Sequence, residues 1–216
     1  MKDARFNVGK MVRLAVLVAI IIVMANTPLG FLPIGPVTIT LLPIPVAIAA
    51  IAVGPTGGAI AGAVFGLTAF LRGFGINMMG PSWLAAVLIN SNLIFAFIVL
   101  VVTRMFVGLI PGLLYKALNE KKGKTFATLV ACLAAPLTNT VLFLGTLVLL
   151  FGNAEFYTAG GTVTTGLSIA VGALIVVNIL IEVGFGFITG SAISRTLIHF
   201  FPGKTRLQGD KKKAVV

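Results

Sequence analysis

Two charged residues lie in the middle of long apolar segments of this sequence. Arg104 stands within VLVVTRMFVGL, and Glu182 stands within VVNILIEVGFG. If these segments cross a membrane, each charge costs about 2.5–3.5 kcal/mol on insertion scales, so both residues are candidates for a functional site. Arg104 could bind an anionic group of a ligand through a bidentate contact, with Glu182 orienting Arg104 or accepting from a ligand hydroxyl. The other interpretation is a buried ion pair that fixes helix packing, and the two are compatible.

Two asparagines lie within apolar segments of the same kind. Asn178 is four residues before Glu182, so the two side chains share one face if this segment is helical. Asn139, in PLTNTVLF, brings an amide to another segment, where Pro136 can loosen the backbone and expose a carbonyl. Each asparagine either lines a pocket or bonds a neighbouring helix, and the sequence leaves both roles open.

Further candidates lie in segments rich in proline, glycine and asparagine. The stretch TPLGFLPIGPVTITLLPIPV contains five prolines, which remove backbone donors and disfavour helix. Within VTIT, Thr38 and Thr40 share a face if the chain is extended there. The segment 73–90 contributes Asn77 and Trp83. For Trp83, an anchor at the membrane interface is the alternative role.

Residues for enzymatic chemistry are scarce. The sequence has one histidine, His199, one cysteine, Cys132, and no aspartate within any apolar segment. These residues cannot assemble a metal site, a thiol–histidine pair or a carboxylate dyad. No phosphate-binding G-x-x-x-x-G-K-[ST] pattern is present either. We therefore expect no catalytic residue, no metal and no cofactor, and a binding and delivery subunit rather than a self-sufficient pump.

The composition predicts a membrane protein. Of the 216 residues, 58% are hydrophobic and only 10% are charged, with a mean hydropathy of +1.13. Soluble domains are nearer half apolar and a quarter charged. The 25 glycines agree, because glycine lets membrane helices approach closely. We expect a multi-pass protein of the cell membrane.

The apolar segments predict an all-α bundle of six transmembrane helices. A span needs roughly 20 mostly apolar residues. By that measure the helices lie at about 10–27, 37–53, 56–72, 91–118, 125–151 and 165–198. The first run has no cleavage pattern after it and is expected to be a retained span. We expect one six-helix membrane domain over 1–200 and a basic cytoplasmic tail over 201–216.

The basic residues predict the orientation. All of the 16 lysines and arginines except Arg72 and Arg104 lie at or before the start of the first helix, around the connection between the fourth and fifth, or around and after the end of the sixth. The positive-inside rule makes these regions and both termini cytoplasmic. Topology and anionic membrane lipid account for the net charge of +11, so we expect no nucleic-acid partner.

With this topology the proline-rich stretch becomes the first external loop and the start of the second helix. Irregular backbone at membrane depth is tolerated only where it is buried in protein or lines a water-filled cavity. The stretch therefore either caps a cavity or is an ordinary connection. The nine residues 28–36 exceed what a plain turn needs, which favours the cavity.

Several segments resemble the substrate-binding S components of energy-coupling factor (ECF) vitamin transporters. The resemblance covers about residues 10–195 and is carried by PLGFLPIGPVTITLLPIPVAIAAIAVGPTGGAIAGAVFGLTAF, RMFVGLIPGLLYKAL and PLTNTVLFLG. It extends to Ala15 and Ala19, whose A-x-x-x-A spacing gives a flat strip where another helix can come close.

The resemblance implies a six-helix protein that binds one vitamin near its external face. It also implies partners: a transmembrane coupling subunit, which the Ala15–Ala19 face would meet, and two cytoplasmic ATPase subunits. The TNT segment and the arginine before MFVGLIPGLLYK are similar to pantothenate-type or generic members. Pantothenate is small, anionic and rich in hydroxyl and amide groups, which suits an arginine among asparagines and threonines. Another vitamin (riboflavin, pyridoxine-type or folate) or a non-transport membrane scaffold is the alternative.

Overall fold

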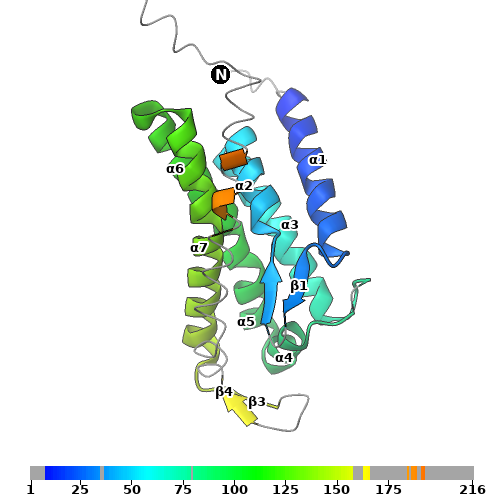
Figure 1. Ribbon diagram of the computed structural model, residues 1–216. Helices are drawn as coiled ribbons and strands as arrows, with labels where there is room; N and C mark the ends of the chain where they lie inside the picture. The colour runs from blue at the N-terminus through cyan, green and yellow to red at the C-terminus, as the bar shows by residue number, and fades with distance from the viewer. Residues whose placement is uncertain are drawn as a thin grey trace, which may run out of the picture.

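The chain folds mainly into helices, and the computed structural model describes residues 8–34, 37–78, 80–157, 163–165, 184, 186–188 and 191–192. In this part of the chain the helices are α1 (Val8–Ala25), α2 (Pro43–Ala52), α3 (Pro55–Gly73), α4 (Trp83–Ser91), α5 (Leu93–Phe97), the π-helix η1 (Ile98–Val102), α6 (Thr103–Lys122) and α7 (Lys124–Phe151) (Figure 1). Two short antiparallel hairpins accompany them, made by β1 (Phe31–Ile34) with β2 (Val37–Thr40) and by β3 (Glu155–Tyr157) with β4 (Val163–Thr165).

Three helical stretches are long and apolar enough to cross a membrane. They are Val8–Ala25, Leu93–Glu120 and Lys124–Phe151, and the second runs through α5, η1 and α6. These stretches confirm the predicted helices in the same places, and α3 confirms the predicted helix at 56–72. Most of the predicted helix at 165–198 lies outside the described residues. The described part is thus mainly helical and holds three candidate membrane spans.

Two predicted boundaries are wrong because extended chain replaces helix. The helix predicted at 37–53 begins only at Pro43, since residues 37–40 pair with β1 as strand β2. The β-branched run Val-Thr-Ile-Thr between prolines favours a strand, whereas Pro43 suits the first turn of a helix. Thr165, the predicted start of the last helix, lies in β4.

One helix was not predicted. Residues 83–90 lie in a segment expected to be a loop, yet together with Ser91, the predicted start of the fourth helix, they form α4. The helix ends where Asn92 takes an extended conformation and caps α5, since its Oδ1 accepts from the backbone N–H groups of Ile94 and Phe95 at 3.1 Å each. A single side chain therefore separates α4 from the long helical stretch that follows.

The helices α3 and α6 pack with their backbones in contact. Gly58, Gly62 and Gly66 recur every four residues on α3. A Cβ atom at these positions would meet the carbonyl oxygens of Gly108, Arg104 and Leu100 respectively, so only glycine fits. This spacing is the small-residue pattern that lets membrane helices approach closely. The contact fixes the backbone of Arg104 against α3.

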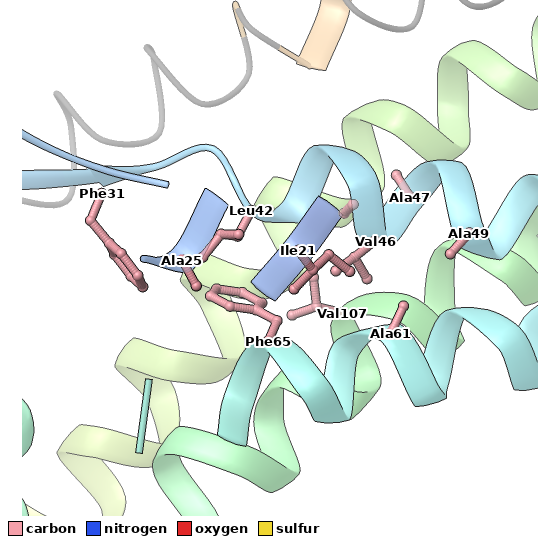
Figure 2. Close-up of a cluster of buried hydrophobic side chains, with 11 residues drawn as sticks. Ile21, Ala25, Phe31, Leu42, Val46, Ala47, Ala49, Ala61, Phe65 and Val107 are labelled. Atoms are coloured by element: carbon pink, nitrogen blue, oxygen red, sulfur yellow. The ribbon is translucent and has the colours of Figure 1, made fainter. Parts of the chain in front are cut away.

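The apolar core gathers residues from α1, the first hairpin, α2, α3 and α6. Its largest fully buried members are Phe65, Ile21, Leu42 and Val46. Figure 2 shows the Phe65 ring of α3 between Leu42 and Val107. The core therefore joins the N-terminal helices to the helix that carries Arg104.

The two ends of the bundle differ in character. The first hairpin, α4 and the hairpin of β3 and β4 lie at one end, whereas α1 begins and α6 turns into α7 at the other (Figure 1). The turn from α6 to α7 consists of Gly123 alone, whose φ of 89° is a left-handed conformation that favours glycine. The predicted loop NEKKGKT is therefore shorter than expected.

Candidate functional site

Arg104 lies inside the helical bundle near the start of α6. Only 6% of the residue is exposed. Its guanidinium carbon lies 4.9 Å from the ring centre of Phe65 on α3 and 5.1 Å from that of Phe143 on α7. Cation–π contacts at desolvated sites are worth about 2 kcal/mol or more. Two aromatic rings thus replace part of the hydration that the cation loses.

The helix that carries Arg104 also supplies hydrogen-bond acceptors for it. Nη1 of Arg104 donates to the backbone carbonyls of Val99 at 3.3 Å and Leu100 at 3.0 Å. Thr103 donates its hydroxyl to the same Val99 carbonyl at 2.5 Å. These acceptors belong to the π-helix η1, a rare element that often marks functional sites.

Asn139 lies on the buried face of α7. It is 8% exposed, and its Oδ1 has no hydrogen-bond partner among the described residues. Phe143 stands one helical turn further, so Asn139 and the ring that contacts Arg104 share a face. An unsatisfied buried acceptor costs about 1–3 kcal/mol, which a donor group on a ligand could recover. The structure therefore brings the predicted residues Arg104 and Asn139 to the same helix pair.

Pro136 lies within α7 one turn before Asn139. Proline has no N–H, so the Cys132 carbonyl lacks the donor that an unbroken helix would supply. A Cβ at Gly186 would lie 2.8 Å from this carbonyl oxygen. Gly186 thus packs closely on α7 at the proline.

Asn77, another predicted site residue, makes polar contacts in the loop that follows α3. Asn77 donates its side-chain amide to the Ala25 carbonyl at 3.0 Å, and Asn26 Oδ1 accepts from the backbone N–H of Met78 at 3.4 Å. The loop after α3 is therefore tied to the end of α1.

Arg72 joins the same loop to the first hairpin. Its guanidinium carbon lies 4.5 Å from the ring centre of Phe31, and its Nε donates to the Gly80 carbonyl at 3.3 Å. Phe31 pairs with Thr40 across the hairpin, and Thr38 pairs with Pro33. Trp83, 40% exposed, begins α4 just beyond this loop.

The small residues of α1 lie on its outer side. Ala15 and Ala19 are both exposed, whereas Ile21 and Ala25 are buried in the core. The A-x-x-x-A strip is therefore available to another surface. The predicted site residues Asn178 and Glu182 lie outside the described residues, so the pairing of Glu182 with Arg104 remains a prediction.

Sequence reasoning missed four contributors to the Arg104 environment. Phe65 and Phe143 carried no signal of their own among 16 phenylalanines. Thr103 could have been noticed as the residue beside the arginine, and Gly62 as part of a four-residue glycine repeat. Within the described residues, no group of three potential metal ligands occurs.

A buried cation among apolar helices is by default a candidate functional site of a membrane protein. The family model described as "ECF transporter, substrate-specific component" matches residues 9–194. The chain therefore belongs to the substrate-specific S components of ECF transporters. It is a transporter subunit that binds substrate and not an enzyme.

A curated relative supports the same family. The "Pantothenic acid transporter PanT" of Lactococcus lactis subsp. cremoris (strain MG1363) is 30% identical over 162 residues. The match covers 73% of this chain and 76% of the relative.

Proposed function

We propose that the chain binds pantothenate for uptake into the cell. The observation that carries this proposal is a desolvated arginine in the bundle of a chain that is similar to a pantothenic acid transporter. A carboxylate is the ligand group that a guanidinium binds best, since the two can form parallel hydrogen bonds.

The remaining polar residues suit the other end of such a ligand. Asn139 offers a buried acceptor for a hydroxyl or amide N–H of pantothenate. We assign Asn178 and Glu182 to the same pocket from their positions in the sequence, with Glu182 orienting Arg104. Residues of the external loops would close over the ligand; they are Thr38, Thr40, Asn77 and Trp83.

We further propose that the protein lies in the plasma membrane. It would have six transmembrane helices, with both termini in the cytoplasm. Residues 1–200 would form the membrane domain, and 201–216 a basic tail. Helix α1, which carries Lys10 and Arg13, begins at the end of the bundle where Lys124 starts α7 (Figure 1). The gathering of basic residues at one end supports this orientation.

The proposed partners are a transmembrane coupling subunit and two cytoplasmic ATPase subunits. The exposed Ala15–Ala19 strip would meet the coupling subunit. Replacing both alanines with leucine should leave pantothenate binding unchanged and abolish uptake by cells that express the whole transporter. Ile22, also exposed on α1, provides the control, because Ile22→Leu should not alter uptake. Undiminished uptake by the double variant would remove this assignment.

A thermal-shift screen tests the substrate. The purified chain in detergent is heated with pantothenate, riboflavin, pyridoxine or folate, and the unfolding temperatures are compared. A ligand at 100 times its Kd stabilises the folded state by about 2.7 kcal/mol. Pantothenate should stand out. Stabilisation by another vitamin alone would redirect the assignment, and no stabiliser at all would favour a scaffold without a ligand.

A further inference from the structure

The π-helix η1 ends directly before Thr103 and Arg104. At its end, the backbone N–H of Thr103 donates to the Ile98 carbonyl, five residues earlier. In an α-helix this N–H would pair with the Val99 carbonyl, four residues earlier. The Val99 carbonyl instead accepts from two side chains, Thr103 Oγ1 and Arg104 Nη1. The widened turn therefore frees an acceptor that the arginine uses.

This arrangement fixes the plane and the direction of the guanidinium. Nη1 is held by the Val99 and Leu100 carbonyls, and the rings of Phe65 and Phe143 contact the guanidinium. Because the guanidinium is planar and rigid, fixing Nη1 and the plane also fixes the edge formed by Nε and Nη2. That edge has the geometry for two parallel hydrogen bonds to one carboxylate.

Thr103 makes the shortest hydrogen bond in this group. The residue is 5% exposed, and its hydroxyl lies 2.5 Å from the Val99 oxygen, compared with 3.3 Å for Arg104 Nη1. Threonine hydroxyls that bond a carbonyl four residues earlier often bend helices. Here the Thr103 hydroxyl bonds the Val99 carbonyl in place of the Thr103 backbone N–H, which pairs with the Ile98 carbonyl instead.

We infer that Thr103 is a positioning residue for substrate recognition: its hydroxyl holds the π-turn in the form that aims Arg104 at the anionic end of the substrate. This inference rests on the proposed role of Arg104 as the partner of the pantothenate carboxylate. Thr103 does not touch the substrate in this scheme and acts only through the Val99 carbonyl.

The chain offers a matched control at Thr128. This threonine is also buried, and its hydroxyl also donates to a carbonyl four residues earlier, that of Lys124, at 2.8 Å. It lies in the first turns of α7, far along the chain from Asn139 and Phe143. Thr128→Val removes the same kind of hydroxyl-to-carbonyl hydrogen bond without affecting η1.

The experiment compares Thr103→Val with Thr128→Val in the full-length protein in detergent. Calorimetric titration measures Kd for pantothenate and for its analogue in which a primary carboxamide replaces the carboxylate. Thr103→Val should weaken pantothenate binding about tenfold, the worth of one misdirected charged hydrogen bond, and leave the carboxamide within about twofold. Thr103→Ser should restore the preference for the acid, and Thr128→Val should not change it.

The outcomes distinguish a failure of the Thr103 inference from a failure of the proposed Arg104–carboxylate contact. Equal losses for acid and carboxamide, or an unchanged ratio, would show that Thr103 only supports the fold and would overturn the inference. If Arg104→Ala removes the preference for the acid while Thr103→Val keeps it, the inference fails alone. A wild-type protein that does not discriminate acid from carboxamide contradicts both. If Thr103→Val does not fold, Thr103→Ala replaces it, and the same two Kd values are compared.

Discussion

The two arginines outside the basic clusters, Arg72 and Arg104, use the same contacts in opposite settings. Each places its guanidinium over a phenylalanine ring and donates to a backbone carbonyl. Arg72 does so at the end of α3 between two loops, where it is half-buried. Arg104 does so inside the bundle, where it has lost nearly all its water.

The difference shows that burial, rather than the list of contacts, decides what an arginine can do. A cation–π contact at an exposed site is worth about 0.5–1 kcal/mol. That suffices to join loops but leaves the charge screened by water. A desolvated cation interacts far more strongly with a ligand anion, because the local dielectric is low. We therefore assign loop coupling to Arg72 and substrate binding to Arg104.

The largest expected effect follows from removing the buried charge. Arg104→Ala should weaken pantothenate binding by 30-fold or more, since truncating one partner of a buried charge pair costs about 2–5 kcal/mol. Arg72→Ala, the matched control, should change the affinity by less than about fivefold. Calorimetric titration of both variants measures the difference. Equal losses of affinity in the two variants would refute Arg104 as the carboxylate partner and the distinction drawn between the two arginines.

A smaller effect is expected from the glycine seam that holds Arg104 in place. Gly62→Ala puts a methyl group against the Arg104 carbonyl and should destabilise the fold by about 1–3 kcal/mol. Thermal unfolding without ligand measures the change. Gly145→Ala on α7 is the control, because a Cβ there meets nothing within 4 Å. If the Gly62 variant unfolds at the wild-type temperature, α3 and α6 do not pack as tightly as described.

The smallest effect is expected at the loops. Arg72→Ala should expose the region around Trp83, the single tryptophan, to the quencher acrylamide. Phe31→Leu removes the other partner and should act in the same way. Because the two residues share one contact, acrylamide should quench the Trp83 fluorescence of the double variant no more than that of either single variant. Additive increases in quenching would show that Arg72 and Phe31 do not cooperate.

The helices of the bundle were largely predictable, because long apolar runs bounded by proline, glycine and lysine are strong local signals. The predicted helices at 10–27, 56–72 and 125–151 lie within two residues of α1, α3 and α7. The first hairpin was not predicted, since prolines could equally begin a helix, as Pro43 does. The end of α6 was placed early at 118, because polar residues after Ala117 suggested a loop although they continue the helix.

The site was predictable only in part. Arg104 and Asn139 were found because polar groups are costly in apolar segments. Phe65 is 39 residues from Arg104 in the sequence, so no spacing rule links the two. In the π-turn the Val99 carbonyl accepts from the side chains of Thr103 and Arg104, which a count of apolar residues does not register. Tertiary packing therefore decides how the arginine is held.

The single residue between α6 and α7 restricts how these two helices can move apart. Because Gly123 is the whole connection, α6 and α7 can separate only by a change of the angle between them at this residue. Arg104 stands 19 residues from this joint, roughly 28 Å along α6 at 1.5 Å per residue. A small change of angle at Gly123 is thus multiplied at the arginine and at Asn139 on the opposite arm, while the basic end of the pair stays closed.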